Sequence, residues 1–141
     1  MAGKVHDVMT RDVDVARPEQ PAHEIARHMA QGGFGFMPVV DGGRLVGAIT
    51  DRDLTVRVLA AGKDASTPVG EVATREVSFV RADADLEEVL ARMAGERLHR
   101  LPVLDETDEL VGVVTLADLT AARAGAGPKD ISAPHNVRTF G

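Results

Sequence analysis

Two strand-to-helix junctions carry the residues whose types and spacing best suit ligand chemistry. In each, a threonine ends an apolar run and an aspartate follows three residues later: Thr50 with Asp53, and Thr115 with Asp118. A helix start presents unpaired backbone N–H groups and the positive end of the helix dipole, so a phosphate placed there is stabilised, and a threonine hydroxyl adds a donor. A carboxylate one turn into the helix can accept hydrogen bonds from a ribose diol. The pattern therefore fits a nucleotide.

The same spacing has a purely structural interpretation. Thr-x-x-Asp has the form of a capping box, in which the two side chains pair with free backbone N–H groups at the helix start. Spacing alone favours the cap, and both interpretations stay open.

The two junctions belong to an internal repeat that covers most of the chain. The segment 5–55 returns 64 residues later and, after one inserted residue, 65 residues later, with 19 of 51 positions identical. Typical residue usage would give about 4 identities by chance. A length of 141 residues suits one compact domain. We therefore expect the copies to be halves of one body.

The two copies differ in the cations that flank the junctions. The second copy carries His99 and Arg100 just before an apolar segment, and the first copy has Phe36 at the position of the arginine. Arg52 of the first copy aligns in turn with Ala117. Arginine binds phosphate oxygens through its planar fork and histidine does so in a pH-dependent way. Solvated charge beside a strand would explain the pair equally well.

Each copy predicts the same order of elements to position these residues: strand, helix, strand, strand, helix. Apolar periodicity and turn residues place the elements of the two copies as follows: strands at 12–15 and 76–80, helices at 21–31 and 86–96, strands at 37–40 and 101–104, strands at 45–49 and 110–114, and second helices from 51 and from 116.

The chain divides into four segments on this pattern. We assign residues 1–60 to the first repeat, 61–68 to a linker and 69–123 to the second repeat. Residues 124–141 lack a periodic apolar face and are expected to form a flexible C-terminal tail, loose or held by a partner.

Composition narrows the class of protein. Hydrophobic residues make up 44% of the chain and aromatic residues only 3%, which predicts an aliphatic core, and the net charge of −6 argues against a nucleic-acid partner. The chain contains no cysteine, which excludes disulfides and thiolate chemistry. With no signal-like segment and no run of membrane-spanning length, we expect a soluble cytoplasmic protein without a membrane partner.

The sequence contains no motif that indicates metal binding or catalysis. His23 and His28 are five residues apart, off a common helical face, and the acidic run 83–88 begins a helix, where negative charge offsets the dipole. The chain has no Walker loop, no Gly-x-Ser-x-Gly elbow and no recognisable pair of catalytic carboxylates. We predict no metal site and no enzymatic activity.

The ordered motifs resemble the cystathionine beta-synthase (CBS) domain pair, also called a Bateman module, over residues 5–122. The resemblance rests on Val8-Met9-Thr10, Met37-Pro38-Val39-Val40-Asp41 and Leu45-Val46-Gly47-Ala48-Ile49-Thr50-Asp51-Arg52-Asp53-Leu54, the last two of which recur as Leu101-Pro102-Val103 and Leu110-Val111-Gly112-Val113-Val114-Thr115. It implies an α/β (α+β) fold, with two pseudo-symmetric β-α-β-β-α CBS repeats packed as one Bateman module. Two clefts between the repeats hold adenosine nucleotides in many relatives, and two modules commonly join, so a homodimer is expected.

The resemblance also implies roles for single residues. Phosphate-contacting and ribose-binding positions fall on Thr50 and Asp53, and on Thr115 and Asp118. Positions that contact phosphate in some relatives fall on Arg52, His99 and Arg100. Positions that line the base fall on Thr10, Val13, Thr74, Val77, Phe36, Pro38, Arg100 and Pro102. The missing cation at Phe36 and the Leu116-Ala117 pair depart from the family pattern. They predict clefts of unequal affinity, with one occupied in preference to both.

The resulting prediction is a stand-alone regulatory module. It would sense an adenosine nucleotide (AMP, ADP, ATP or a related molecule) in the inter-repeat cleft, require no cofactor, and signal through its dimer or an unknown effector protein. The alternative is an interaction or structural CBS pair with empty clefts, whose Thr-x-x-Asp elements serve only as caps.

Overall fold

A computed structural model describes residues 3–125 and 136–139 of the chain. The chain forms two compact units: unit 1 comprises Met1–Val13 and Ser78–Val137, and unit 2 comprises Asp14–Val77 and Arg138–Gly141. These boundaries cut across the sequence repeat, because the first residues of each copy belong to the unit that contains the body of the other copy. Each unit is therefore built from both copies.

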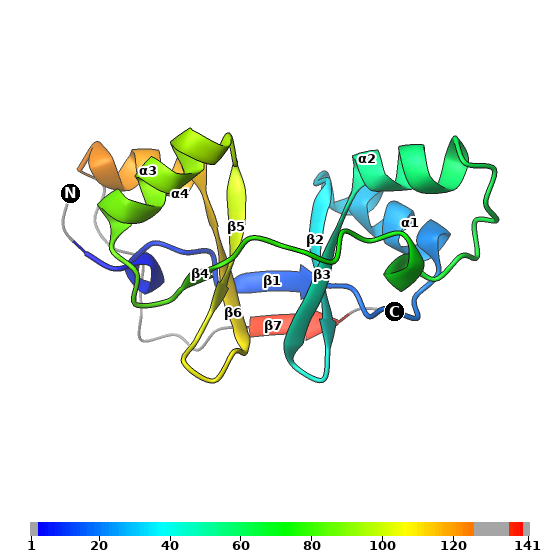
Figure 1. Ribbon diagram of the computed structural model, residues 1–141, viewed down its shortest axis with the longest axis horizontal. Helices are drawn as coiled ribbons and strands as arrows, with labels where there is room; N and C mark the ends of the chain where they lie inside the picture. The colour runs from blue at the N-terminus through cyan, green and yellow to red at the C-terminus, as the bar shows by residue number, and fades with distance from the viewer. Residues whose placement is uncertain (1–2, 126–135, 140–141) are drawn as a thin grey trace. The chain divides into compact units, whose positions relative to one another are not determined.

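Unit 2 contains a helix, a two-stranded hairpin and a second helix. These elements are α1 (Ala22–Gly32), β2 (Phe36–Asp41), β3 (Arg44–Thr50), α2 (Asp51–Asp53) with its continuation, the π-helix η2 (Leu54–Leu59), and the 3-10 helix η3 (Val69–Glu71). The antiparallel hairpin turns through Gly42 and Gly43, whose φ angles of 59° and 83° are left-handed values that favour glycine. The helices α1 and α2 lie on the same side of the hairpin (Figure 1).

Unit 1 repeats this plan with one more strand. Its elements are η1 (Val5–Asp7), β4 (Val80–Arg81), α3 (Leu86–Glu96), β5 (Arg100–Leu104), β6 (Leu110–Thr115) and α4 (Leu116–Arg123). The strand β5 is central, parallel to β4 and antiparallel to β6. The helices α3 and α4 lie on one side of this sheet (Figure 1).

These elements confirm the mixed α and β fold and the repeated order of elements. The prediction of a strand at 76–80 is wrong for most of that range, since only Val80 lies in a strand. The equivalent strand of the first copy, β1 (Asp12–Val15), has a pairing partner, whereas no described strand pairs with residues 76–79. A short extended segment becomes a strand only where another backbone pairs with it.

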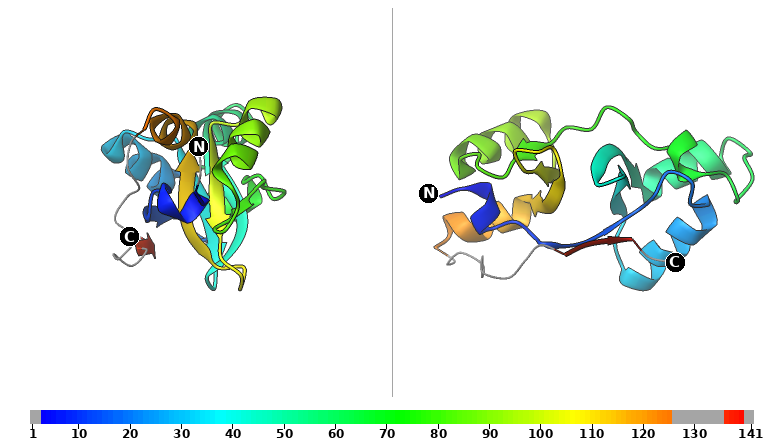
Figure 2. Two further views of the ribbon diagram at one scale, coloured as in Figure 1. Left: turned by 90° about the vertical axis from the view of Figure 1, so that its left-hand side faces the viewer. Right: turned by 90° about the horizontal axis from the view of Figure 1, so that it is seen from below.

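The partner of β1 is β7 (Asn136–Thr139), which the sequence pattern did not predict. Figure 2 shows the two strands side by side. The strand lies inside the segment expected to be a flexible tail, of which residues 126–135, 140 and 141 lie outside the described part. The Arg138 Nε lies 2.8 Å from Asp14 Oδ1, and His28 Nε2 lies 2.7 Å from Asp14 Oδ2. One half-buried carboxylate therefore contacts the last strand and α1.

Each unit has its own aliphatic core, which includes side chains from the start of the other copy. In unit 1, Val5 on η1 is fully buried against Leu101 and Val114 of the sheet. In unit 2, Val69 on η3 is fully buried in the same way among residues of α1 and the hairpin. Within the described residues, no helix has the length and apolar character needed to cross a bilayer.

The linker between the repeats is folded against α1. The Ala22 N–H, at the start of α1, donates to the Thr67 carbonyl over 2.8 Å. The backbone N–H and the hydroxyl of Ser66 both donate to Asp64 Oδ1, and these bonds lower the pKa of the Asp64 carboxyl. The linker thus satisfies a helix end that would otherwise need water or a capping side chain.

The shared cores predict where a single core mutation acts. We expect Val5→Ala to destabilise unit 1 by about 2 kcal/mol, because it removes buried methyl groups and leaves a cavity. Amide hydrogen exchange should quicken in α3, β5 and β6, although Val5 belongs to the first copy. The matched variant Val69→Ala, 64 residues on, should quicken exchange in α1, β2 and β3 instead. Faster exchange confined to the mutated copy would contradict the shared cores.

Candidate functional site

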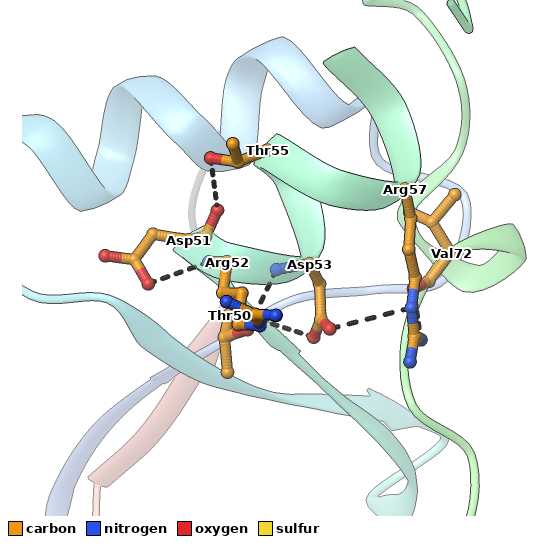
Figure 3. A network of polar contacts seen from close by, with 7 residues as sticks. All are labelled: Thr50, Asp51, Arg52, Asp53, Thr55, Arg57 and Val72. Atoms are coloured by element: carbon orange, nitrogen blue, oxygen red, sulfur yellow. Dashed lines mark hydrogen bonds and ion pairs between the residues drawn. The ribbon is translucent and has the colours of Figure 1, made fainter. Parts of the chain in front are cut away.

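Thr50 and Asp53 form a capping box where β3 ends and α2 begins. The Asp53 N–H donates to Thr50 Oγ1 and the Thr50 N–H donates to Asp53 Oδ2, both over 3.0 Å. Figure 3 shows this arrangement together with the side chains around it. The structural interpretation of the Thr-x-x-Asp spacing is therefore confirmed in unit 2.

Thr115 and Asp118 form the same box in unit 1. The two reciprocal bonds again measure 3.0 Å, at the junction of β6 and α4. The same pair of capping bonds thus forms at both junctions of the repeat.

The capping bonds of the first box leave it with capacity for a ligand. A carboxylate offers about four lone-pair positions and a threonine hydroxyl keeps its own hydrogen to donate. In unit 2 the capping N–H contacts only Asp53 Oδ2, and the side chain is 14% exposed. A diol hydroxyl could therefore donate to the carboxylate, and the threonine could donate to a phosphate, without breaking the cap. Capping and ligand binding are compatible.

A backbone segment from the other copy lies against each box. Thr74 exchanges two hydrogen bonds of 2.9 Å with Ala48 on β3, and Thr10 exchanges bonds of 2.8 and 3.0 Å with Val113 on β6. Both threonines were predicted to line the base of a nucleotide. Each bridge places such a residue two positions along the strand from a capping threonine.

A glycine makes each bridge possible. A Cβ on Gly112 would lie 2.8 Å from the Thr10 carbonyl oxygen, and one on Gly47 would lie 2.8 Å from the Thr74 carbonyl oxygen. Real Cβ atoms do not approach a backbone oxygen so closely. Glycine inside a strand often marks the close approach of another backbone. That signal was present in the sequence and could have located these bridges.

The structure divides the predicted site residues equally between the units, and each set combines both copies. Unit 2 holds Phe36, Pro38, Thr50, Arg52, Asp53, Thr74 and Val77, and unit 1 holds Thr10, Val13, His99, Arg100, Pro102, Thr115 and Asp118. Pairing across the hairpins sets Phe36 opposite Thr50 and Arg100 opposite Thr115. Ligand contact by these residues stays a prediction.

The two helix starts differ in how their first N–H groups are satisfied. In both, the first helical N–H donates to the chain before the hairpin: Asp51 to the Gly35 carbonyl over 3.0 Å, and Leu116 to the His99 carbonyl over 2.8 Å. In unit 2 the next N–H, of Arg52, donates to Asp51 Oδ1 over 2.8 Å. The alanine at the matching place in unit 1 follows a leucine, whose side chain has no oxygen to accept this hydrogen bond.

Unit 1 is also hollowed beside its box. The concave surface has a volume of about 670 Å³ and is lined by His99, Arg100, Thr115, Leu116, Ala117, Thr120, Ala121 and Ala124. The two predicted cations therefore line the same hollow as the capping threonine. In unit 2 the Asp51 carboxylate packs so closely on Gly35 that a Cβ there would lie 2.5 Å from its Oδ2.

Sequence reasoning missed one further residue beside the first box, Arg57. Its Nη1 donates to the Val72 carbonyl over 2.9 Å, and its Nε lies 3.8 Å from Asp53 Oδ1. The spacing of four residues from Asp53, which brings charged side chains together on a helix, was the available signal.

The described residues contain no cluster of three or more histidine, aspartate or glutamate side chains able to hold a metal ion. The imidazole of His28 contacts Asp14 and meets the edge of Phe34 at 5.6 Å between ring centroids. His23 instead borders a shallow apolar hollow over α1 and η2.

The close approach at Gly112 predicts a site-specific effect of one methyl group. Gly112→Ala should push Thr10 off β6, break the two bridging bonds and destabilise unit 1 by about 1–3 kcal/mol. Thermal melting and amide exchange at Thr10 and Val113 would measure this. The control is Gly95→Ala, on α3, where a Cβ meets nothing within 4 Å; it should stabilise the helix by about 0.5–1 kcal/mol. Equal effects at both positions would contradict the bridge.

Curated relatives share this architecture at the level of sequence. The chain is 41% identical to the CBS domain-containing protein YhcV of Bacillus subtilis over 115 residues, which covers 82% of the chain and 81% of the relative. It is 36% identical to hypoxic response protein 1 of Mycobacterium tuberculosis, with 80% of each chain covered.

Solved structures of similar proteins have the same fold. A crystal structure of Hypoxic Response Protein I with two coordinated zinc ions aligns with a TM-score of 0.76 at 34% identity, over 85% of the chain and 98% of that protein. CBSX2 in complex with AMP aligns at 0.75 and 25% identity, over 86% and 96%. The CBS domain pair of MJ0100, in complex with 5′-methylthioadenosine and S-adenosyl-L-methionine, aligns at 0.74 and 27%, over 89% and 98%.

The model of the CBS domain family matches the chain twice, over residues 5–60 and 69–125. These two matches coincide with the two copies of the internal repeat and contain both capping boxes. The chain belongs to the CBS domain family and carries a tandem pair of its domains.

Proposed function

We propose that this CBS pair is a regulatory module that binds an adenosine derivative and does no covalent chemistry. The observation that carries the proposal is the pair of capping boxes, each of which fixes a hydroxyl and a carboxylate at the end of a strand that pairs with a backbone segment from the other copy. The ribose would bind Asp53 or Asp118. The AMP, methylthioadenosine and S-adenosylmethionine complexes of similar CBS pairs support this choice of ligand class.

The electrostatics of the two boxes favour phosphate in unit 1. There His99 and Arg100 line a hollow that also contains Thr115, and cations paired with a helix start stabilise phosphate oxygens. In unit 2 the Asp51 carboxylate already accepts the Arg52 N–H, and its negative charge would offset the attraction of the Arg52 guanidinium for phosphate. We therefore assign the phosphorylated ligand to unit 1 and a weaker or uncharged one to unit 2.

Regulation would follow from the way each site is assembled. Because each box and its bridging segment come from different copies, a ligand that contacts both stabilises one arrangement of the two copies over others. Such a ligand shifts populations by its difference in affinity for the alternative arrangements. The signal would pass through the dimer or an effector protein, and a cytoplasmic location remains a prediction.

A ligand panel in a thermal melt tests the proposal directly. AMP, ADP, ATP, S-adenosylmethionine and NADH are each added to the full chain at millimolar concentration. A ligand present at a hundredfold excess over its Kd should stabilise the fold by about 2.7 kcal/mol. Asp118→Asn, which keeps an oxygen for the cap, should reduce the shift with AMP more than Asp53→Asn does. No shift with any ligand in the panel would overturn the proposal.

The second candidate is an interaction module whose sites stay empty. It is supported by the capping boxes, which satisfy both helix starts without a ligand. In that case Asp53→Asn would weaken the helix that begins at Asp51, while no nucleotide would protect the wild-type chain.

We also propose that the partner in solution is a second copy of this chain, which docks on the helical face of unit 2. Leu59 is 77% exposed and Val56 is 46% exposed on η2, beside an apolar hollow of about 320 Å³ between α1 and η2. Exposed apolar side chains beside an apolar hollow suit an interaction site.

A charge placed on this face should separate the copies. Leu59→Glu would bury an unpaired carboxylate in the dimer, so we expect sedimentation to report a monomer at micromolar concentration. The control Val46→Glu introduces the same charge at a strand residue that is 42% exposed, and it should leave the dimer intact. A Leu59→Glu dimer as stable as the wild type would rule out this face.

A further inference from the structure

Arg57 connects the carboxylate of the first box to the backbone of another segment. Its Nη1 donates to the Val72 carbonyl over 2.9 Å while its Nε lies 3.8 Å from Asp53 Oδ1. Figure 3 shows the side chain descending from η2 beside Val72, with Asp53 facing it. The arginine is 46% exposed and the aspartate only 14%, so the guanidinium covers an acid that is largely shielded from solvent.

One end of this connection lies in the proposed ligand site, and the other lies in the segment that leads to it. Asp53 is the proposed ribose carboxylate. Val72 is buried in the core of unit 2, and two residues later Thr74 forms the backbone bridge to β3. Arg57 therefore links the proposed ribose carboxylate to the segment that carries Thr74, a residue predicted to line the base.

The second copy has a different residue at the position of Arg57. Ala122 occupies the position of Arg57, and Val8 that of Val72. Asp118 keeps its capping bonds but has no arginine at this position of its helix. The element that carries Arg57 differs as well, since η2 is a π-helix, a rare form that is enriched at functional sites.

We propose that Arg57 is a positioning residue for the ribose carboxylate of unit 2. This inference rests on the proposed function. The charge of Arg57 restricts the Asp53 side chain to one orientation. Its bond to Val72 fixes the position of that side chain relative to the nearby Thr74. A site whose groups are already fixed loses less entropy when a ligand binds. Arg57 thereby gives unit 2 selectivity for a ribose diol where its phosphate contacts are poor.

The experiment compares two nucleosides that differ only in that diol. Adenosine and 2′-deoxyadenosine carry no phosphate, so their difference in affinity reports on the carboxylate. Titration calorimetry is done in an Asp118→Asn background, which leaves Asp53 as the one ribose carboxylate. Arg57→Ala should weaken adenosine about fivefold, which corresponds to about 1 kcal/mol for a lost hydrogen bond, and should leave 2′-deoxyadenosine nearly unchanged. Arg57→Lys, which can reach one acceptor but not both, should fall between.

Two controls separate positioning from a structural effect. Arg27→Ala removes the same charge from an exposed position on α1 and should leave both affinities unchanged. Arg57→Ala combined with Asp53→Asn should weaken adenosine no more than Asp53→Asn alone, because the arginine acts through the aspartate.

The outcomes distinguish this inference from the proposed function. If the background protein binds neither nucleoside and the wild-type chain binds none of the nucleotide panel, the proposed function fails and the role of Arg57 fails with it. If adenosine binds but Arg57→Ala weakens both nucleosides equally, or neither, the positioning role alone is overturned.

Discussion

Thr10 and Val113 exchange two backbone hydrogen bonds over Gly112, and Thr74 and Ala48 do the same over Gly47. These bridges tie the start of one copy to the central hairpin of the other. The apolar residues next to them, such as Val5 and Val69, enter the core of the same unit. Neither unit could form from one copy alone, since its core and its candidate site would each lack a segment.

The capping boxes place polar side chains where a ligand could bind. A box satisfies the helix start by itself, so the fold is complete without a ligand. It also fixes a hydroxyl and a carboxylate three residues apart, at the end of the strand that the other copy pairs with. Rigid groups held by secondary structure are well suited to recognise a small polar molecule. Under the proposed function, the two side chains of each box would serve both stability and recognition.

The differences between the copies then give the two sites different characters. Unit 1 has cations beside a hollow, and unit 2 has Asp51 and Arg57 close to its box. Because the backbone bonds of the two junctions are nearly the same, side-chain charge is the main physical difference between them. One fold can in this way present two electrostatic environments to related ligands.

The sequence by itself determined the elements, the repeat and the chemical groups. Helix periodicity located α1 and α3 to within about a residue, and the Thr-x-x-Asp spacing identified both capping boxes, because these signals are local. It did not reveal β7, the exchange of Val5 and Val69 between the cores, or the contact from Arg57 to Val72. Each of these joins segments far apart in the chain, and a backbone or side-chain partner at long range leaves no periodic pattern. Only the tertiary structure decided which copy completes which site.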